Sequence, residues 1–316
     1  MATVLLERIG LALITMIIIV VVVFFALELM PGDACSVNLG RGASDSMLAA
    51  CQKRLGLDQP ALWRFSAWAG DFLTGDLGIS MQRERPIAEV VGWRLRNTLI
   101  LAGLTAAIGI PLALGLGVLA GLNPDGPLDM TISGIAIFAM TVPEFISGTL
   151  MILLFSVILG WAAGVVTIGY KAPALDLLKA SVLPAATLIF ILAAHILRMV
   201  RASVIEVMQS DFVQMARLKG VPHRRIILHH VLPNALLPAI SIIGLTMAWL
   251  LGGVVIVESV FNFPGLGRLA VDAVADQDLP LVQAIALLFG FIYVLTNLGA
   301  DLLALTLNPR LRTRRK

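Results

Sequence analysis

The groups best suited to chemistry are concentrated in one polar stretch, residues 214–238, which reads QMARLKGVPHRRIILHHVLPNALLP. Three of the four histidines of the chain lie here, at His223, His229 and His230. Histidines can hold zinc, but a zinc site is completed by Cys, further His or carboxylate ligands at close spacing. No Cys, Asp or Glu occurs in this stretch, so we expect no metal site. The basic side chains then form either a docking face for a partner protein or a solvated basic loop.

Motifs that would assign catalysis are missing from the sequence. It contains no GxxxxGK[ST] phosphate-binding loop, so the chain has no such cradle for ATP. It contains no HExxH motif, and no Ser/His or paired-Asp arrangement at usable spacing. We therefore expect a protein that is not an enzyme and that uses no cofactor of its own.

The polar stretch stands out because the rest of the chain is apolar. Hydrophobic residues make up 59% and charged residues 14% of the 316 residues, and the mean hydropathy is +0.94. The net charge is only +3, and the basic residues form no face that would bind nucleic acid. A helix needs about 20 apolar residues to cross a bilayer. We predict an all-α integral membrane protein with six transmembrane helices, at 9–29, 98–121, 130–159, 183–200, 236–257 and 281–305.

The orientation follows from Lys and Arg, which are enriched in the short cytoplasmic loops and tails of membrane proteins. Here they cluster at 198–225 and 310–316. Both segments are expected in the cytoplasm, and six spans then put both termini there. The expected units are residues 1–29, an N-terminal tail and first helix; residues 30–97, an extracytoplasmic loop with surface helices; and residues 98–316, a five-helix core that includes the cytoplasmic loop 202–235.

The two cysteines of the chain, Cys35 and Cys51, lie in the loop 30–97. In an oxidising compartment they could form a disulfide, which would stabilise the loop by roughly 3 kcal/mol on a chain-entropy model. The alternative is a pair of free thiols near the membrane surface.

A long helix is predicted to lead into the polar stretch. No helix breaker occurs from His195 to Lys219, and Gly220 and Pro222 then interrupt the pattern. Glycine readily takes the left-handed conformation that ends a helix, and proline suits the first turn of the next one. We expect a helix, a tight turn, and a second short helix that ends near Pro233.

This stretch resembles the cytoplasmic loop of ABC importer permeases, whose pattern is E-A-A, three residues, G, nine residues, I-x-L-P. Here Gln214-Met215-Ala216 stands for E-A-A, Gly220 is the glycine, and His230-Val231-Leu232-Pro233 stands for I-x-L-P. The Glu, the first Ala and the Ile of the pattern are replaced.

Other segments resemble the dipeptide, oligopeptide and nickel permeases of the DppB/OppB type. They are GDLGIS at 75–80, RLRNTL at 94–99, RMVRAS at 198–203, VESVFNFPGLGRL at 257–269, LPLVQA at 279–284 and NPRLR at 308–312. The resemblance covers essentially the whole chain and keeps its order. It implies the architecture of a type I ABC importer permease in a bacterial-type inner membrane.

The resemblance also implies partners and a substrate. The chain would form half of a translocation path with a second permease subunit, as a heterodimer, and would work with two cytoplasmic ATP-binding subunits and an extracytoplasmic solute-binding protein. The substrate would be a di- or oligopeptide, and nickel or another small solute is the alternative for the same plan. A secondary transporter would instead show repeats and paired ionisable groups, and neither is evident.

Three sets of site residues follow from this resemblance and from the sequence. The segment coupled to the ATPase subunits would comprise Gln214, Met215, Ala216, Gly220, Pro222, Arg224, Arg225, His230, Leu232 and Pro233. A surface for the binding protein would include Glu258, Phe263, Pro264, Gly265, Gly267, Arg268 and Asp276. Glu144 in the third span is a candidate for the translocation path, because an ionisable residue inside a membrane is costly and by default functional.

Overall fold

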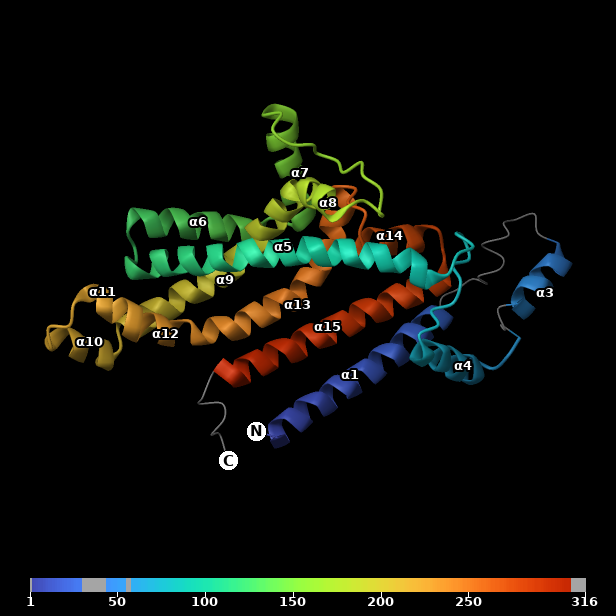
Figure 1. Cartoon of the computed structure of the whole chain (residues 1–316), viewed down its shortest axis with the longest axis horizontal. Helices are drawn as coiled ribbons and strands as arrows, with labels where there is room; N and C mark the ends of the chain where they lie inside the picture. Colours follow the sequence, from blue (N-terminus) through green and yellow to red (C-terminus); the bar gives the residue numbers. More distant parts are fainter. Residues whose placement is uncertain (1, 30–43, 55–57, 308–316) are drawn as a thin grey trace.

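The computed structural model describes residues 2–29, 44–54 and 58–307, and these residues are mainly helical (Figure 1). The α-helices are α1 (Ala2–Glu28), α3 (Asp45–Arg54), α4 (Ala61–Thr74), α5 (Ile87–Leu122), α6 (Pro127–Thr141), α7 (Glu144–Met151), α8 (Ala174–Ala180), α9 (Val182–Met208), α10 (Asp211–Leu218), α11 (His223–Ile226), α12 (Leu232–Ala235), α13 (Leu237–Val260), α14 (Leu266–Ala275) and α15 (Leu279–Leu307). Two short π-helices are η1 (Ile152–Ile158) and η2 (Ile227–Val231). The described residues include no strand beyond an isolated bridge between Ile79 and Pro86.

Five described helices are long and apolar enough to cross a bilayer, namely α1, α5, α9, α13 and α15. The predicted span 130–159 is not one continuous helix. It is divided into α6 and the α7–η1 pair, which are bent by 114° at the break. Val142 is extended there, with φ −81° and ψ 125°, and Pro143 follows it. Because proline lacks an N–H and disfavours a helical residue before it, the prediction of an unbroken helix is wrong at this point.

The long helices run along the longest axis of the molecule, with α9 at their centre (Figure 1). Of the apolar segment of α9, 56% is buried within the chain, against 6% for α1. Helix α5 approaches α9 closely. A Cβ on Gly117 or Gly121 of α5 would lie 2.7 Å from the Cβ of Val200 or Val204 of α9. Small residues let two membrane helices approach closely, and these two glycines permit the α5–α9 contact.

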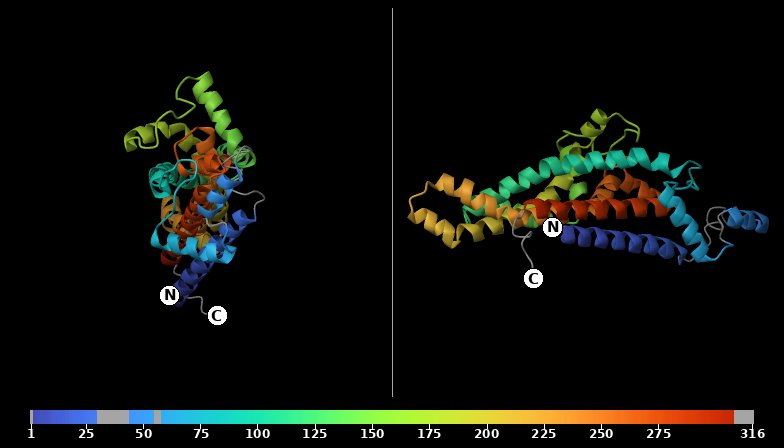
Figure 2. Two further views of the ribbon diagram at one scale, coloured as in Figure 1. Left: turned by 90° about the vertical axis from the view of Figure 1, so that its right-hand side faces the viewer. Right: turned by 60° about the horizontal axis from the view of Figure 1, so that its bottom comes forward.

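The two ends of the bundle carry different elements (Figures 1 and 2). Helices α10, α11 and α12 lie at one end, and α1 begins and α15 ends toward that same end. Helices α3, α4 and α14 lie at the opposite end. We call the first the coupling end and the second the outer end, after the roles that the sequence leads us to expect of them. The pair of cysteines falls outside this description, because Cys35 and the side chain of Cys51 are not among the described residues.

The α7–η1 pair leaves the bundle sideways (Figures 1 and 2). Its surface is apolar, and six of its large side chains are each at least 44% exposed: Phe145, Leu150, Leu153, Leu154, Val157 and Ile158. An apolar surface of this kind needs lipid or another protein to cover it.

Candidate functional site

The polar stretch at the coupling end begins with a break in the long helix. The sequence predicts an uninterrupted helix up to Lys219, but α9 ends at Met208 and α10 starts at Asp211. Ser210 between them is extended, with ψ 150°, and its hydroxyl donates to the carbonyl of Val207 at 2.5 Å. Serine commonly ends a helix by bonding the nearby backbone in this way. The predicted continuous helix is therefore wrong across Gln209 and Ser210.

The turn after α10 has the conformation expected from its glycine. Gly220 has φ +75°, in the left-handed region that glycine enters without a Cβ penalty. Its N–H donates to the carbonyl of Arg217 at 3.0 Å, and the N–H of Val221 donates to that of Ala216 at 3.1 Å. These bonds satisfy carbonyls that the helix end leaves free. Pro222 then precedes the first residue of α11, as the sequence predicts to within one residue.

From Val213 to Ala235 this segment has one face inside the bundle. Val213, Ala216, Ile226, Val231 and Ala235 are buried and belong to the main apolar core. The segment is therefore packed onto the bundle and is not a detached loop.

The opposite face mixes apolar and basic groups. Phe212, Met215 and Leu218 of α10 are 47%, 53% and 82% exposed. Arg217, Arg224, Arg225 and His229 are exposed beside them in the sequence. Apolar side chains at this spacing lie on one helix face, and a merely solvated loop has no reason to expose them. This combination favours a docking face, and Phe212 and Leu218 were not among the residues selected from the sequence.

Further into the bundle from this segment, one ion pair joins α6 to α9. Arg201 donates from Nε to Oδ1 of Asp129 at 2.5 Å and from Nη2 to Oδ2 at 2.6 Å. Asp129 is 2% exposed and also accepts from the N–H of Asp125 and the hydroxyl of Ser133. Residues 122–129, LNPDGPLD, hold no Lys or Arg. They supply the carboxylate of Asp129 to the basic end of α9. The absence of Lys and Arg from these residues was the one sequence signal that pointed to this pairing.

At the outer end, a buried carboxylate holds three helices together. Glu258 of α13 is 0% exposed. It accepts a hydrogen bond from the hydroxyl of Thr98 in α5 at 2.6 Å and one from the N–H of Arg268 in α14 at 3.1 Å. The Thr98 hydroxyl oxygen in turn accepts from the N–H of Leu266 at 2.8 Å. A Cβ on Gly265 would lie 2.0 Å from a Glu258 carboxyl oxygen, so the FPGLG turn requires glycine there.

This arrangement changes which residues can form an outer docking surface. Five of the candidates are buried within the chain: Glu258, Phe263, Pro264, Gly265 and Gly267. Arg268 is partly exposed and Asp276 is exposed. The five buried residues thus shape the turn, and of these candidates only Arg268 and Asp276 have side chains that a partner could reach.

A second buried carboxylate, Asp278, clamps residues 79–86 to the turn between α14 and α15. It is 0% exposed and accepts from the hydroxyl of Ser80 and from the N–H of Met81 at 3.1 Å. Arg83 pairs with the neighbouring Asp276 at 3.2 Å. No local sequence signal assigns this role to Asp278, since Ser80 lies in the distant GDLGIS segment.

The candidate path residue Glu144 begins α7 directly after the break. Its carboxylate faces α13, because a Cβ on Gly253 would lie 3.4 Å from both carboxyl oxygens. Within the described residues, Oε2 of Glu144 and Oγ of Ser147 are buried without a hydrogen-bond partner. Two unsatisfied polar groups therefore lie one turn apart where α7 leaves the bundle.

Comparisons with known proteins agree with this architecture. The sequence model of the "Binding-protein-dependent transport system inner membrane component" family matches residues 113–313, and that of its N-terminal region matches residues 1–102. A Brucella suis protein named as a peptide transport system permease is 34% identical over 98% of this chain and 99% of its own length. The glutathione transport system permease protein GsiC of Pectobacterium atrosepticum is 36% identical over 94% of this chain and 95% of its own.

Two solved structures share the fold. One chain of the MetNI methionine ABC transporter has a TM-score of 0.54 and 21% identity, and the match covers 69% of this chain and 96% of that chain. One chain of an amino acid ABC transporter with histidines has a TM-score of 0.52 and 19% identity, covering 67% of this chain and 92% of that chain.

Proposed function

Because this chain belongs to the family of inner membrane components of binding-protein-dependent transport systems, we propose that it imports short peptides as the permease subunit of an ATP-driven ABC importer. The assignment of a peptide substrate rests on a single observation, the full-length similarity to relatives named for peptide and glutathione transport. Glutathione is itself a tripeptide, so both names describe peptide substrates.

The energy for transport comes from partner subunits in this proposal. The complex contains two ATP-binding subunits in the cytoplasm, and the segment from α10 to α12 is the coupling segment, which sits in a groove of the ATPase. The exposed apolar side chains of Phe212, Met215 and Leu218 support it, together with the arginines of α11. Motion of these subunits passes through the Gly220 turn, α10 and the break at Gln209 and Ser210 into α9, which packs against α5 and α13. Rigid elements that move as bodies can switch a path between two states.

A second permease subunit completes the path. The exposed apolar surface of α7 and η1 supports this partner, since it leaves the bundle at the 114° break. The carboxyl oxygen of Glu144 that lacks a hydrogen-bond partner lies at the base of this element, buried against α13, so we propose that a movement of α7 relative to α13 opens it to the path between the two subunits. We propose a heterodimer, with both termini of this chain in the cytoplasm.

The solute-binding protein docks at the outer end. Arg268 and Asp276 on α14 and its following turn, with the adjoining residues 79–86, form the proposed surface. Glu258 and Asp278 fix the backbone beneath it. Elements held by buried hydrogen bonds keep a binding surface in one conformation.

Reconstitution tests the function directly. The chain, its second permease and the ATP-binding subunits are purified together and placed in liposomes, with the binding protein added outside. We expect uptake of radiolabelled dialanine that requires both ATP and the binding protein. Uptake driven by a proton or sodium gradient without ATP would contradict the proposal, and so would an ATP-driven complex that moves no di- or tripeptide.

A further inference from the structure

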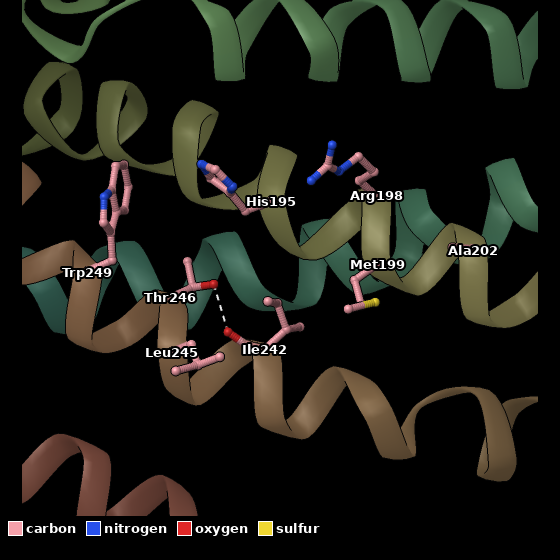
Figure 3. Close-up of a pocket in the computed structure, with 8 residues that line it drawn as sticks. All are labelled: His195, Arg198, Met199, Ala202, Ile242, Leu245, Thr246 and Trp249. Carbon is pink, nitrogen blue, oxygen red and sulfur yellow. Dashed lines mark hydrogen bonds between the residues drawn. The ribbon is translucent and has the colours of Figure 1, made fainter.

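A groove of about 500 Å³ opens between α9 and α13. Figure 3 shows His195, Arg198, Met199 and Ala202 on α9 and Ile242, Leu245, Thr246 and Trp249 on the facing α13. The volume is in the range of sites for small molecules. The groove belongs to neither the coupling segment nor the outer surface described above.

The groove contains two basic side chains without counter-charges. His195 and Arg198 are separated by three residues, so they lie one turn apart on the same face of α9. Neither has an ion pair or a hydrogen bond from its side chain to any other described residue. Arg201, one turn further on, differs, because Asp129 pairs with it in two bonds. The groove therefore holds positive charge that this part of the chain does not neutralise.

His195 lies within the predicted span 183–200, and Arg198 lies near the cytoplasmic margin of that span. At 1.5 Å of rise per residue, Arg198 lies about 4.5 Å and His195 about 9 Å deeper along α9 than Arg201. Ionisable groups within membrane helices face a water-filled cavity or a polar partner. Arg198 is exposed and His195 partly exposed in this chain, so both are open to an occupant of the groove.

The other residues that line the groove determine what else the bound molecule must contain. The rings of His195 and Trp249 lie 5.3 Å apart, which fixes the imidazole beside an aromatic wall. The hydroxyl of Thr246 donates to the carbonyl of Ile242 at 2.7 Å within α13, so its one hydrogen is already used. Met199, Ile242 and Leu245 provide an apolar wall, and flexible methionine adapts to different side chains. The basic side chains of the groove thus select an occupant with an anionic group. The apolar wall accepts apolar groups of different shapes.

We propose that this groove binds a short peptide during translocation, with the guanidinium of Arg198 on its terminal carboxylate and His195 donating a hydrogen bond to the same group. Guanidinium matches a carboxylate with two parallel hydrogen bonds. The variable side chain of the peptide lies against Met199, Ile242 and Leu245. This inference rests on the proposed function, since it takes the peptide as the occupant.

The test measures binding to the full chain, purified with its second permease and ATP-binding subunits, in phosphatidylcholine nanodiscs without the binding protein. Dialanine is titrated by calorimetry against its C-terminal amide, which lacks the carboxylate charge. We expect dialanine to bind at least tenfold more tightly than the amide, the size of one charge-assisted hydrogen bond. The Arg198→Gln variant should lose this tenfold preference, while Lys179→Gln, an exposed lysine of α8, should keep it.

The comparison on the unmodified chain and one further titration decide the result. The comparison of dialanine with its amide on the unmodified chain needs no variant, so a misfolded Arg198→Gln protein does not prevent a decision. Equal binding of both ligands, or no binding, overturns the inference. The titration is repeated with phosphatidylglycerol in the disc. Loss of dialanine binding there that is restored by Arg198→Gln would assign the groove to an anionic lipid headgroup and also overturn it.

ATP-driven uptake of dialanine by the complete transporter is measured in parallel. Absence of uptake contradicts the proposed function itself. Normal uptake without carboxylate-dependent binding contradicts only the assignment of the groove.

Discussion

Glu258 is the residue on which the outer turn depends most. It is fully buried, and two donors from other helices converge on it. We predict that Glu258→Ala lowers the free energy of unfolding by about 2 kcal/mol or more, because it leaves the Thr98 hydroxyl and the Arg268 amide without an acceptor in a buried site. Unfolding of the purified chain in detergent, followed by circular dichroism, measures this loss.

The matched control is a carboxylate in the same region that is not buried. Asp272 pairs with Arg268 at 3.8 Å and is 38% exposed. Exposed ion pairs contribute about 0–1 kcal/mol, so Asp272→Ala should leave stability nearly unchanged. Equal losses for the two variants would mean that Glu258 is not a structural carboxylate.

Gly220 tests the coupling segment at the level of one residue. Its φ of +75° suits glycine, and a Cβ there would meet no atom within 4 Å. The cost of Gly220→Leu is therefore conformational, about 1 kcal/mol or more, and it should change the angle between α10 and α11. We predict that peptide uptake and stimulated ATP hydrolysis by the assembled complex fall together, while the binding protein still binds peptide.

Asparagine provides the control at the same position, because it tolerates the left-handed conformation better than other residues with a Cβ. Gly220→Asn should retain most of the uptake that Gly220→Leu loses. Unchanged uptake in a correctly assembled Gly220→Leu complex would mean that this stretch is only a basic loop.

These two residues differ in how far the sequence could predict them. The conformation of Gly220 is set by its neighbours, and the glycine followed two residues later by proline was enough to predict it. The environment of Glu258 depends on Thr98, which is 160 residues away. Without that contact a glutamate beside a loop resembles a surface residue, and for this reason it was first assigned to the docking surface.

At the scale of elements, the pairing of α5 with α9 rests on glycines. Gly117 and Gly121 face α9 at distances that leave no room for a Cβ, whereas a Cβ on Gly115 of the same helix would meet nothing within 4 Å. We predict that Gly117→Val destabilises the chain by about 1–3 kcal/mol, since overpacking forces the helices apart. The Gly115→Val variant controls for the change in helix propensity, and similar unfolding of the two variants would argue against the close α5–α9 contact.

The helices also show how far the length of an apolar stretch can predict a transmembrane helix. Hydropathy alone predicted most of the spans, because a helix across a bilayer must satisfy its own backbone. The same criterion hid the break at Pro143, since α6, α7 and η1 together form one long apolar stretch. The proline was a visible signal of the break, but the direction in which α7 leaves depends on packing against α9 and α13.

At the scale of the whole molecule, the chain is built as one part of an assembly. Three of its surfaces call for partners of different chemistry. The α7–η1 pair is apolar, the coupling segment is apolar and basic, and the outer surface is charged. Each lies on a different element, and the bundle of α5, α9 and α13 connects all three. A movement at the coupling segment can therefore reach the groove between α9 and α13 without passing through a flexible loop.

The orientation of the bundle gives the last prediction. Leu218 at the coupling end is 82% exposed, and Ala275 at the outer end is also exposed. In a background with Cys35→Ser and Cys51→Ser, Leu218→Cys and Ala275→Cys each introduce one thiol. If the basic coupling segment is cytoplasmic, as the distribution of Lys and Arg requires, a membrane-impermeant maleimide added to spheroplasts should label only the Ala275→Cys variant. The Leu218→Cys variant, expressed without the ATP-binding subunits that would cover this thiol, should react after the membrane is disrupted. Labelling of Leu218→Cys alone in intact spheroplasts would reverse the topology and place the polar stretch with the binding protein, where it could not couple to ATP.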